Sequence, residues 1–450
     1  MRNPFAFKRK PKVQATKEDS SCNIEPKIIP RPDHNISRNH ISKNAVKVLN
    51  RLNQAGYEAH LVGGGVRDLL LGVEPKDFDI ATDALPEEVN DLFRNCRLIG
   101  RRFRLAHVHF GREIIEVATF RANHETDGDR VIEDGMIKRD NVYGTIDDDV
   151  WRRDFTINAL YYNIADFSIV DYVGGVADVM AGRIRFIGDP EERYREDPVR
   201  MLRAIRFAAK LGFTIDPATE EPIARLAHLL EDIPAARLFE EVNKLFLGGN
   251  ALQTFEKLRQ YGLYGQLFPQ VEKSLQEEEN GFPQMLLIKA LENTDKRISI
   301  GKPINPAFLY SVMLWQPMQQ QLEHLLGKGV PLYEAQRLAA DKVILNQIKK
   351  VAIPKRFTHV VREIWDLQNR LKNRTGKRPY ALLENKRFRA AYDFLLLRAE
   401  VGGAPQALAD WWTEFQDANE DRQREMQTGL PTDKSKRRRR PRKRKPSASA

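Results

Sequence analysis

Two stretches near the start of the chain carry residues whose types and spacing could do chemistry. Residues 63–65 are three consecutive glycines after 59–62, which reads as a short strand, and Asp77 and Asp79 stand two residues apart soon afterwards. Glycines after a strand let backbone N–H groups approach an anion. Side chains two apart in a strand share a face, where two carboxylates can hold divalent metal. The pattern predicts a triphosphate cradle beside a metal site; the alternative is a flexible turn and a solvated Asp pair.

Nucleotide polymerisation would suit such a site, because it needs two divalent ions more than covalent help from protein. Magnesium or manganese would be held by a few carboxylates plus substrate phosphates. Glu116, on an apolar face of a predicted strand, or Asp154 would supply a third anion. Forked hydrogen bonds from nearby arginines could neutralise the triphosphate. The arginines near these carboxylates are Arg67, Arg121, Arg152 and Arg153.

A second pattern lies at Asp197-Pro198, followed by Arg200. Asp before Pro favours a helix start, and residues three apart share one helix face. An acceptor and a donor so placed could read adenine, which offers an amine and ring nitrogens. The alternative is an ordinary cap with a helical salt bridge.

The elements that must position these residues can be traced by periodicity. We expect a helix at 39–55, strands at 59–62 and around 77–79, a helix at 86–93 and strands at 97–100, 106–110 and 113–120. Residues 122–150 are acidic and glycine-containing and favour a long surface loop. Strand-like pieces follow at 169–172 and 184–187, and helices extend from residue 197 to about residue 416.

Composition limits the class of protein. A chain of 450 residues with 42% hydrophobic residues can form two to four domains, and no run of eighteen apolar residues predicts a membrane span. Cys22 and Cys96 are far apart and read as free thiols of a reducing cytoplasm. The net charge is +11, but residues 434–446 carry ten Lys or Arg, so removing them leaves 11 − 10 = +1. That basic tail indicates a nucleic-acid contact or a solubilising end.

The sequence contains none of the common motifs for several other kinds of enzyme chemistry. The sequence has no G-x-x-x-x-G-K-[ST] loop, and Asp68 occupies the third glycine position of a Rossmann fingerprint. H-E-x-x-H, G-x-S-x-G and paired-cysteine motifs are also missing from the sequence.

Five motifs in order resemble the class II nucleotidyltransferases of the polymerase-β superfamily, which comprise bacterial poly(A) polymerases and CCA-adding enzymes. They are Leu-Val-Gly-Gly-Gly-Val-Arg-Asp, Asp-Phe-Asp, Glu-Val-Ala-Thr-Phe-Arg, Arg-Arg-Asp-Phe-Thr-Ile-Asn-Ala and Glu-Asp-Pro-Val-Arg-Met-Leu-Arg, within residues 40–270. The resemblance implies an α+β fold: a polymerase-β-like head with a mixed sheet, then all-helical neck, body and tail. It also implies metal-binding Asp77 and Asp79, an active-site Asp154, and a nucleotide-selecting pair, Asp197 and Arg200.

Residues 98–108, with an Arg-Arg-Phe core, resemble the signature of the poly(A) polymerase branch. We therefore expect template-independent addition of AMP from ATP to RNA 3′ ends, with Mg²⁺ or Mn²⁺. A CCA-adding tRNA nucleotidyltransferase and a non-catalytic RNA-binding protein stay open as alternatives. The residues expected to bind the nucleotide are Gly63, Gly64, Arg67, Arg121, Arg153, Asn158, Asp197, Arg200, Arg203 and Arg206; those expected to hold metal are Asp77, Asp79 and Glu116.

The expected domains are a disordered extension (1–38), the head (39–190), a helical neck that binds nucleotide and RNA (191–270), a helical RNA-binding body (271–416) and a disordered basic tail (417–450). The expected partners are messenger, regulatory and precursor-tRNA 3′ ends and RNA-decay proteins. We expect a cytoplasmic monomer.

Overall fold

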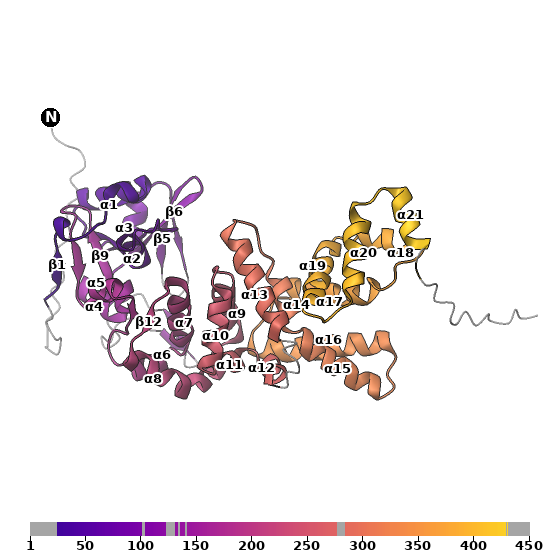
Figure 1. Ribbon diagram of the computed structural model, residues 1–450. Helices are drawn as coiled ribbons and strands as arrows, with labels where there is room; N and C mark the ends of the chain where they lie inside the picture. The colour runs from indigo at the N-terminus through magenta and orange to yellow at the C-terminus, as the bar shows by residue number, and fades with distance from the viewer. Residues whose placement is uncertain are drawn as a thin grey trace, which may run out of the picture. The chain divides into compact units, whose positions relative to one another are not determined.

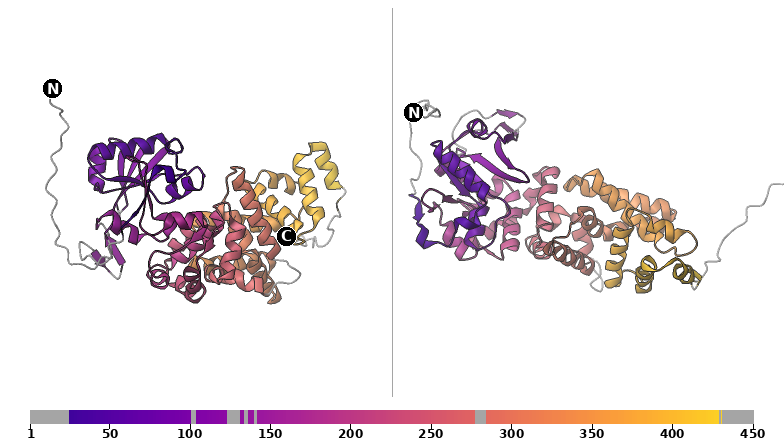
Figure 2. Two further views of the ribbon diagram at one scale, coloured as in Figure 1. Left: turned by 60° about the vertical axis from the view of Figure 1, so that its left-hand side comes forward. Right: turned by 90° about the horizontal axis from the view of Figure 1, so that it is seen from above.

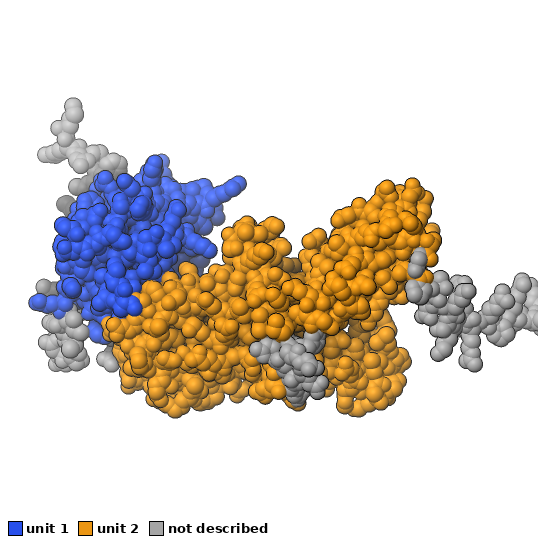
Figure 3. All heavy atoms as spheres, in the orientation of Figure 1, with its two compact units in different colours: residues 1–181 blue, residues 182–450 orange. Residues whose placement is uncertain are grey.

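The computed structural model describes residues 25–100, 104–122, 131–133, 136–139, 142–276, 284–428 and 430. The chain forms two compact units, residues 1–181 and 182–450, which are coloured separately in Figure 3. None of the helices in these described ranges is both long and apolar enough to cross a lipid bilayer.

Unit 1 is built on a mixed eight-stranded sheet in the order β1-β10-β9-β2-β3-β6-β5-β4 (Figure 1). Strands β2 and β3 pair antiparallel, and β3 and β6 pair parallel. The strands of the sheet are β1 (Lys27–Ile29), β2 (Ala59–Val62), β3 (Asp79–Thr82), β4 (Cys96–Ile99), β5 (Leu105–Phe110), β6 (Glu113–Thr119), β9 (Leu160–Asn163) and β10 (Ile169–Asp171). The predicted mixed sheet is confirmed.

The helices of unit 1 are short and packed on this sheet (Figure 2, left). Helix α1 begins after Ser42, whose side chain accepts a hydrogen bond from the N–H of Asn44, and buries Val48, Leu49 and Leu52. It packs against β2, β3 and β6, and α3 packs against β4, β5 and β6. The helices are α1 (Lys43–Gln54), α2 (Gly64–Leu70), α3 (Pro86–Leu92), α4 (Ile146–Arg152) and α5 (Gly175–Met180), with 3-10 turns η1 (Arg31–Asp33), η2 (Arg38–His40) and η3 (Thr156–Asn158).

Three predictions about unit 1 are wrong in part. Residues 25–38 are not structureless, because β1 adds to the sheet edge beside β10. Residues 122–150 are not one loop: β7 (Val131–Glu133) pairs with β8 (Met136–Arg139), and α4 begins after Thr145, which forms a capping box with Asp148. Asp77 lies just before β3 and not within it, although exposure still alternates from residue 77 to residue 80.

In its described residues, unit 2 is helical apart from a small parallel pair, β11 (Arg183–Ile184) with β12 (Thr214–Ile215). Several helices of this unit begin at a proline, as at Pro217, Pro269 and Pro306. The helices are α6 (Pro190–Glu196), α7 (Val199–Leu211), α8 (Pro217–Leu226), η4 (Ala227–Asp232), α9 (Ala235–Phe246), α10 (Ala251–Gln260), α11 (Leu263–Leu267), α12 (Pro269–Gln276), α13 (Gln284–Ser299), α14 (Pro306–Met313), α15 (Trp315–Gly327), α16 (Leu332–Lys350), α17 (Lys355–Arg370), α18 (Arg378–Leu383), α19 (Phe388–Glu400), α20 (Gln406–Asp417) and α21 (Glu420–Thr428).

The last of these helices corrects a further prediction, since residues 420–428 were expected to be disordered. Helix α21 is anchored at Gln423, whose side-chain amide donates to the backbone oxygen of Phe415 (2.8 Å). The basic residues 434–446 lie outside the described residues. The predicted α+β class, a sheet-containing head followed by helices, is confirmed.

Candidate active site

The glycine turn, residues 63–65, connects β2 to α2 in a conformation that only glycine adopts easily. Gly63 has φ +68° and ψ −132°, and its N–H donates to the backbone oxygen of Leu160 in β9 (3.1 Å). A Cβ at Gly63 would stand 3.4 Å from Nη1 of Arg153, and one at Gly65 would stand 3.6 Å from the backbone oxygen of Asp77. The turn is therefore close to the residues around Arg153 and to the segment that carries the acids.

The sheet register brings the predicted acids together at the end of β2. Val62 faces Asp79 across the antiparallel ladder, and Asp79 faces Glu116 across the parallel one. Asp77 and Asp79 are both exposed, whereas Phe78 between them is buried, so the two carboxylates lie on one side. We call Asp77, Asp79 and Glu116 the acidic edge.

The acidic edge is electrostatically crowded. Asp79 keeps contact with solvent, yet its carboxyl group lies among protein atoms. This desolvation, together with the charges of Glu116 and Asp77, raises the pKa of Asp79 to about 6, and Arg153 opposes the rise. A carboxylate whose pKa is raised by neighbouring negative charges marks a place where a bound cation would lower the electrostatic repulsion.

Removing the charge of Asp79 is expected to stabilise the metal-free protein at neutral pH. The pKa is about 6 in the folded state against 3.8 for an unperturbed Asp, so the folded state binds more protons between these values. The free energy of unfolding therefore falls as pH rises through that window. After allowance for solvent screening, Asp79→Asn should gain on the order of 1 kcal/mol at about pH 7.5, and the gain should vanish near pH 4. Urea unfolding in a metal chelator measures it; equal stability of parent and variant at both pH values would contradict it.

Among the described residues, no three Asp, Glu, His or Cys side chains already stand close enough to enclose a metal ion. Glu116 also faces His107 on β5, with 3.3 Å between its Oε2 and Nε2 of the histidine. Such a loose set fits magnesium, which keeps waters and completes its shell with substrate phosphates. The crowding at Asp79 is the observation that favours a cation here.

Asp154 occupies a different position from the acidic edge. It is 8% exposed, and its Oδ1 accepts hydrogen bonds from the N–H of Phe155 (2.8 Å) and from the amide of Asn158 (3.3 Å). Asn158 in turn accepts from Nη1 of Arg67 (2.7 Å), and Arg67 also bonds Asp68. Arg67 is 2% exposed. Asp154, Asn158 and Arg67 thus form a buried hydrogen-bonded network next to the glycine turn. Their contact with nucleotide stays a prediction.

Sequence reasoning missed a second buried cluster, which holds Arg153. Asp149, 7% exposed, accepts from Nη2 of Arg153 (2.8 Å) and from the hydroxyl of Tyr161 (2.7 Å). Burial alone would raise the pKa of Asp149, but Arg153 and the hydrogen bonds hold it below its usual value. The Arg153 guanidinium also stands 5.0 Å from the centre of the Tyr161 ring. The four-residue spacing from Asp149 on α4 to Arg153, directly after the helix, was the available signal.

Arg121 and Arg152, the other two arginines predicted near the carboxylates, lie beside the cluster of Asp149, Arg153 and Tyr161. The backbone N–H of Arg121 approaches Oδ1 of Asp149 (3.4 Å), and Nη1 of Arg152 donates to the backbone oxygen of Ala122 (2.8 Å). Unit 1 therefore gathers the glycine turn, the acidic edge and Arg153, with Asp149 and Tyr161 behind them.

In unit 2, Asp197 and Arg200 are each held by a different neighbour. Oδ1 of Asp197 accepts from the N–H of Val199 (3.2 Å), and its Oδ2 accepts from Arg237 on α9 (2.6 Å). Arg200 bonds Oε2 of Glu196 (2.5 Å) and the backbone oxygen of Arg193 (2.9 Å). The pair is thus fixed at the α6–α7 junction without a salt bridge between its members.

Arg203 and Arg206 follow on α7. Their guanidinium groups stand 5.7 Å and 4.8 Å from the centre of the Phe207 ring. Both belong to unit 2, as do Asp197 and Arg200, and their contact with nucleotide stays a prediction.

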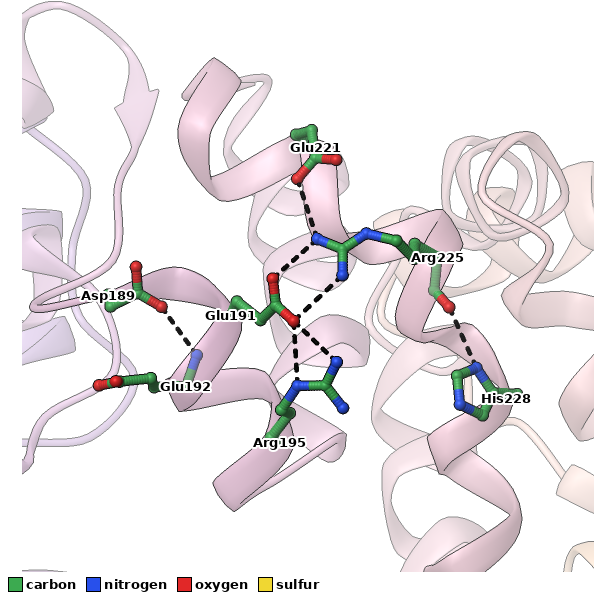
Figure 4. Close-up of polar contacts among 7 residues, drawn as sticks. All are labelled: Asp189, Glu191, Glu192, Arg195, Glu221, Arg225 and His228. Carbon is green, nitrogen blue, oxygen red and sulfur yellow. Dashed lines mark hydrogen bonds and ion pairs between the residues drawn. The ribbon is translucent and has the colours of Figure 1, made fainter.

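The helix before the pair is tied to its neighbour by charged contacts (Figure 4). The Glu191 carboxylate on α6 accepts from Arg195 (2.7 Å) and from both guanidinium ends of Arg225 on α8 (2.8 and 3.1 Å). Exposed ion pairs of this kind orient helices more than they stabilise a fold. Helix α6, whose C-terminal end carries Asp197, is thereby held against α8.

Comparison with known proteins shows which family models and relatives this chain matches. Family models described as the Poly A polymerase head domain, the probable RNA and SrmB-binding site of polymerase A, and the polymerase A arginine-rich C-terminus match residues 59–185, 212–275 and 328–446. Poly(A) polymerase I of Salmonella typhimurium is 53% identical over 429 residues, 93% of this chain and 92% of that protein.

The CCA-adding enzymes are similar over less of the sequence. The CCA-adding enzyme of Bacillus subtilis is 40% identical over 224 residues, 50% of this chain and 55% of that protein. The solved structure of the Bacillus stearothermophilus CCA-adding enzyme in complex with CTP is 26% identical with a TM-score of 0.53, covering 85% of this chain and 81% of that one.

The head domain and these likenesses define a nucleotidyltransferase. Within that class, the chain belongs to the poly(A) polymerase family.

Proposed function

We propose that the protein is a template-independent poly(A) polymerase, which adds AMP from ATP to RNA 3′ ends and releases pyrophosphate. The acidic edge beside the glycine turn is the observation that carries the chemistry. The match over most of the chain to a poly(A) polymerase I, against half for a CCA-adding enzyme, favours adenylate addition. We further propose that the family's RNA-binding region takes messenger, regulatory and precursor-tRNA ends.

In this proposal the RNA 3′ hydroxyl loses its proton to solvent and its oxygen attacks the α-phosphorus of ATP. The bond from the α-phosphorus to the oxygen that bridges to the β-phosphorus breaks, and pyrophosphate leaves with that oxygen. Asp77 and Asp79, with Glu116 as third anion, would hold divalent cations, which when bound activate the hydroxyl and the leaving group. Asp77 and Asp79 would orient the RNA hydroxyl and the leaving pyrophosphate. The backbone N–H groups of the glycine turn would approach the triphosphate.

Arg153 would lie beside the developing negative charge, because it already influences Asp79 and borders Gly63. Glu116 is a better third anion than Asp154, since it faces Asp79 in register while Asp154 is buried in its own hydrogen bonds. Asp154 would contribute indirectly, because it accepts a hydrogen bond from Asn158, which in turn holds Arg67 next to the glycine turn.

Incubation of the protein with a short RNA and each single nucleoside triphosphate tests the function. Long tails with ATP alone support the proposal. Addition of only C-C-A from CTP and ATP would replace it by the CCA-adding alternative, and no transfer at all would leave a non-catalytic RNA-binding protein.

Replacing Asp197 or Arg200 by alanine is expected to blur the choice of nucleotide more than it weakens RNA binding. Both side chains are oriented by hydrogen bonds to neighbours, which a base-reading pair requires. Each base-edge contact is worth about 1–3 kcal/mol of discrimination. The measurement is kcat/KM with ATP, CTP and GTP, with Arg195→Gln on α6 as control. Unchanged preference for ATP in both variants would make the pair purely structural.

RNA-decay proteins as partners, a monomeric state and a cytoplasmic location stay predictions. The matched description of residues 212–275 names SrmB, which supports a protein contact for this region. Sedimentation of the purified protein would test the monomer.

A further inference from the structure

The acidic edge continues across the sheet to a histidine on β5. Glu116 on β6 pairs in register with Asp79 on β3 and, on its other side, with His107 on β5. Residues that stand directly opposite each other on neighbouring strands point to the same face of the sheet. His107 is therefore the next side chain beyond Glu116 on the face that carries the acids, and β5 lies beside β6 in the ribbon (Figure 1).

The contact with His107 is the one that orients the Glu116 carboxylate. Nε2 of His107 stands 3.3 Å from Oε2 of Glu116. Within the described residues, no other side chain lies within hydrogen-bond or ion-pair distance of this carboxylate. The Glu116 side chain is 41% exposed, so without the histidine it could adopt several rotamers in solvent.

His107 is held more firmly than the glutamate that it faces. Strand β5 is paired on both sides, with β4 and with β6, and the His107 side chain is 20% exposed. An imidazole also has fewer side-chain torsions than a glutamate, so it loses less conformational entropy when it is ordered. A fixed N–H group beside a mobile carboxylate can set the orientation of that carboxylate.

The electrostatics of the acidic edge give this orientation a use. The negative charge of Glu116 is one of the causes that raise the pKa of Asp79, so the two carboxylates repel each other across the β3–β6 ladder. A cation shared by both would need an oxygen of each on the side that they have in common. Because His107 contacts Oε2 of Glu116, the other oxygen, Oε1, is left for such a cation.

We propose that His107 is a positioning residue, whose Nε2–H donates to Oε2 of Glu116 and holds Oε1 ready to share a divalent cation with Asp79. The inference rests on the proposed function, which places divalent cations at the acidic edge, and it adds a residue outside the predicted metal-binding set. Hydrogen-bond partners of metal ligands commonly tune metal affinity in this way. His107 itself does not bind the metal in this proposal, because its Nε2 faces the carboxylate.

The test compares His107→Phe, which removes the donor but keeps a ring, with His107→Gln, whose side-chain amide keeps a donor. The matched control is His109→Phe, on the same strand and face, because His109 pairs with Ile114 and not with an acid. Electron paramagnetic resonance of free Mn²⁺ gives the Kd of Mn²⁺ for the full chain without nucleotide. His107→Phe should weaken Mn²⁺ binding by about 10-fold to 100-fold, whereas His107→Gln and the control should stay close to the parent.

Two further readouts separate positioning from a role in folding. The effect of His107→Phe on Mn²⁺ affinity should vanish in a Glu116→Ala background, because the histidine acts through that carboxylate alone. In AMP transfer, His107→Phe should raise the Mg²⁺ concentration that gives half-maximal rate and leave kcat at saturating Mg²⁺ near the parent value. Urea unfolding checks that each variant is folded, and His107→Ala carries the same comparisons if His107→Phe does not unfold cooperatively.

Unchanged Mn²⁺ affinity in His107→Phe would overturn the inference, as would a parent that binds no Mn²⁺. An equal loss in His107→Gln would also overturn it, since the imidazole itself would then be the ligand. A loss of the same size in His109→Phe, or in the Glu116→Ala background, would do so too, because the effect would not pass through Glu116. A parent that binds Mn²⁺ but transfers no AMP would instead overturn the proposed function, which the affinity measurement does not involve.

Discussion

Asparagine at Asp77 or Asp79 is expected to abolish AMP transfer while the protein stays folded. Each change removes a charged oxygen from the acidic edge, and charge stabilisation of a reacting phosphoryl group by bound metal is worth several kcal/mol. A loss of at least about a thousandfold in kcat should follow from about 4 kcal/mol. Glu116 cannot replace either residue, because it is fixed on the neighbouring strand and faces His107.

The matched control is Asp91→Asn, an exposed carboxylate on α3. Thermal unfolding with and without magnesium gives a second readout: metal should stabilise the parent and the control but not the two site variants. Substantial tailing by either site variant, in a protein that still unfolds cooperatively, would place the metal site elsewhere.

Alanine at Asp149 is expected to destabilise unit 1 by about 2–3 kcal/mol, because it leaves the part-buried Arg153 charge without its carboxylate partner, and the remaining exposure of Arg153 reduces the penalty. Phenylalanine at Tyr161 removes one hydrogen bond to the same carboxylate and should cost only about 1 kcal/mol. Hydrogen exchange of peptides from residues 146–163 reports the local free energy of opening, with Asp91→Ala as surface control.

A small effect of Asp149→Ala, close to that of Tyr161→Phe, would mean that water or Asn158 can compensate Arg153. The two variants also separate stability from function. The acidic edge is intact in both, so any loss of AMP transfer by Tyr161→Phe would come from displacement of Arg153.

The sequence predicted the acids and the glycine turn because their chemistry depends on local spacing. Gly63 needs a positive φ, and Asp77 and Asp79 need only an extended backbone to share a face. Glu116 could be placed beside them by strand parity, and the parallel β3–β6 ladder bears out that neighbourhood.

The features that could not be predicted from the sequence depend on partners far away in the chain or on weak local signals. Strand β1 has three residues and exists because β10 offers its edge. The acidic run at 147–149 resembled a loop, but it stabilises the N-terminal end of α4 and supplies Asp149 to Arg153. The hydrogen-bond partners of Asp197 and Arg200 could not be predicted either, since Arg237 contacts Asp197 from another helix.

The sheet order has a consequence for how this site comes into being during synthesis. Its parts are contributed by strands far apart in the chain: Asp79 from β3, Glu116 from β6, and the oxygen of Leu160 that fixes Gly63 from the start of β9. No short nascent segment can therefore carry a working site, because contacts of high sequence separation form only after the intervening chain has been closed into loops. A ribosome-bound head should gain metal affinity in one late step, once β9 has emerged and docked beside β2.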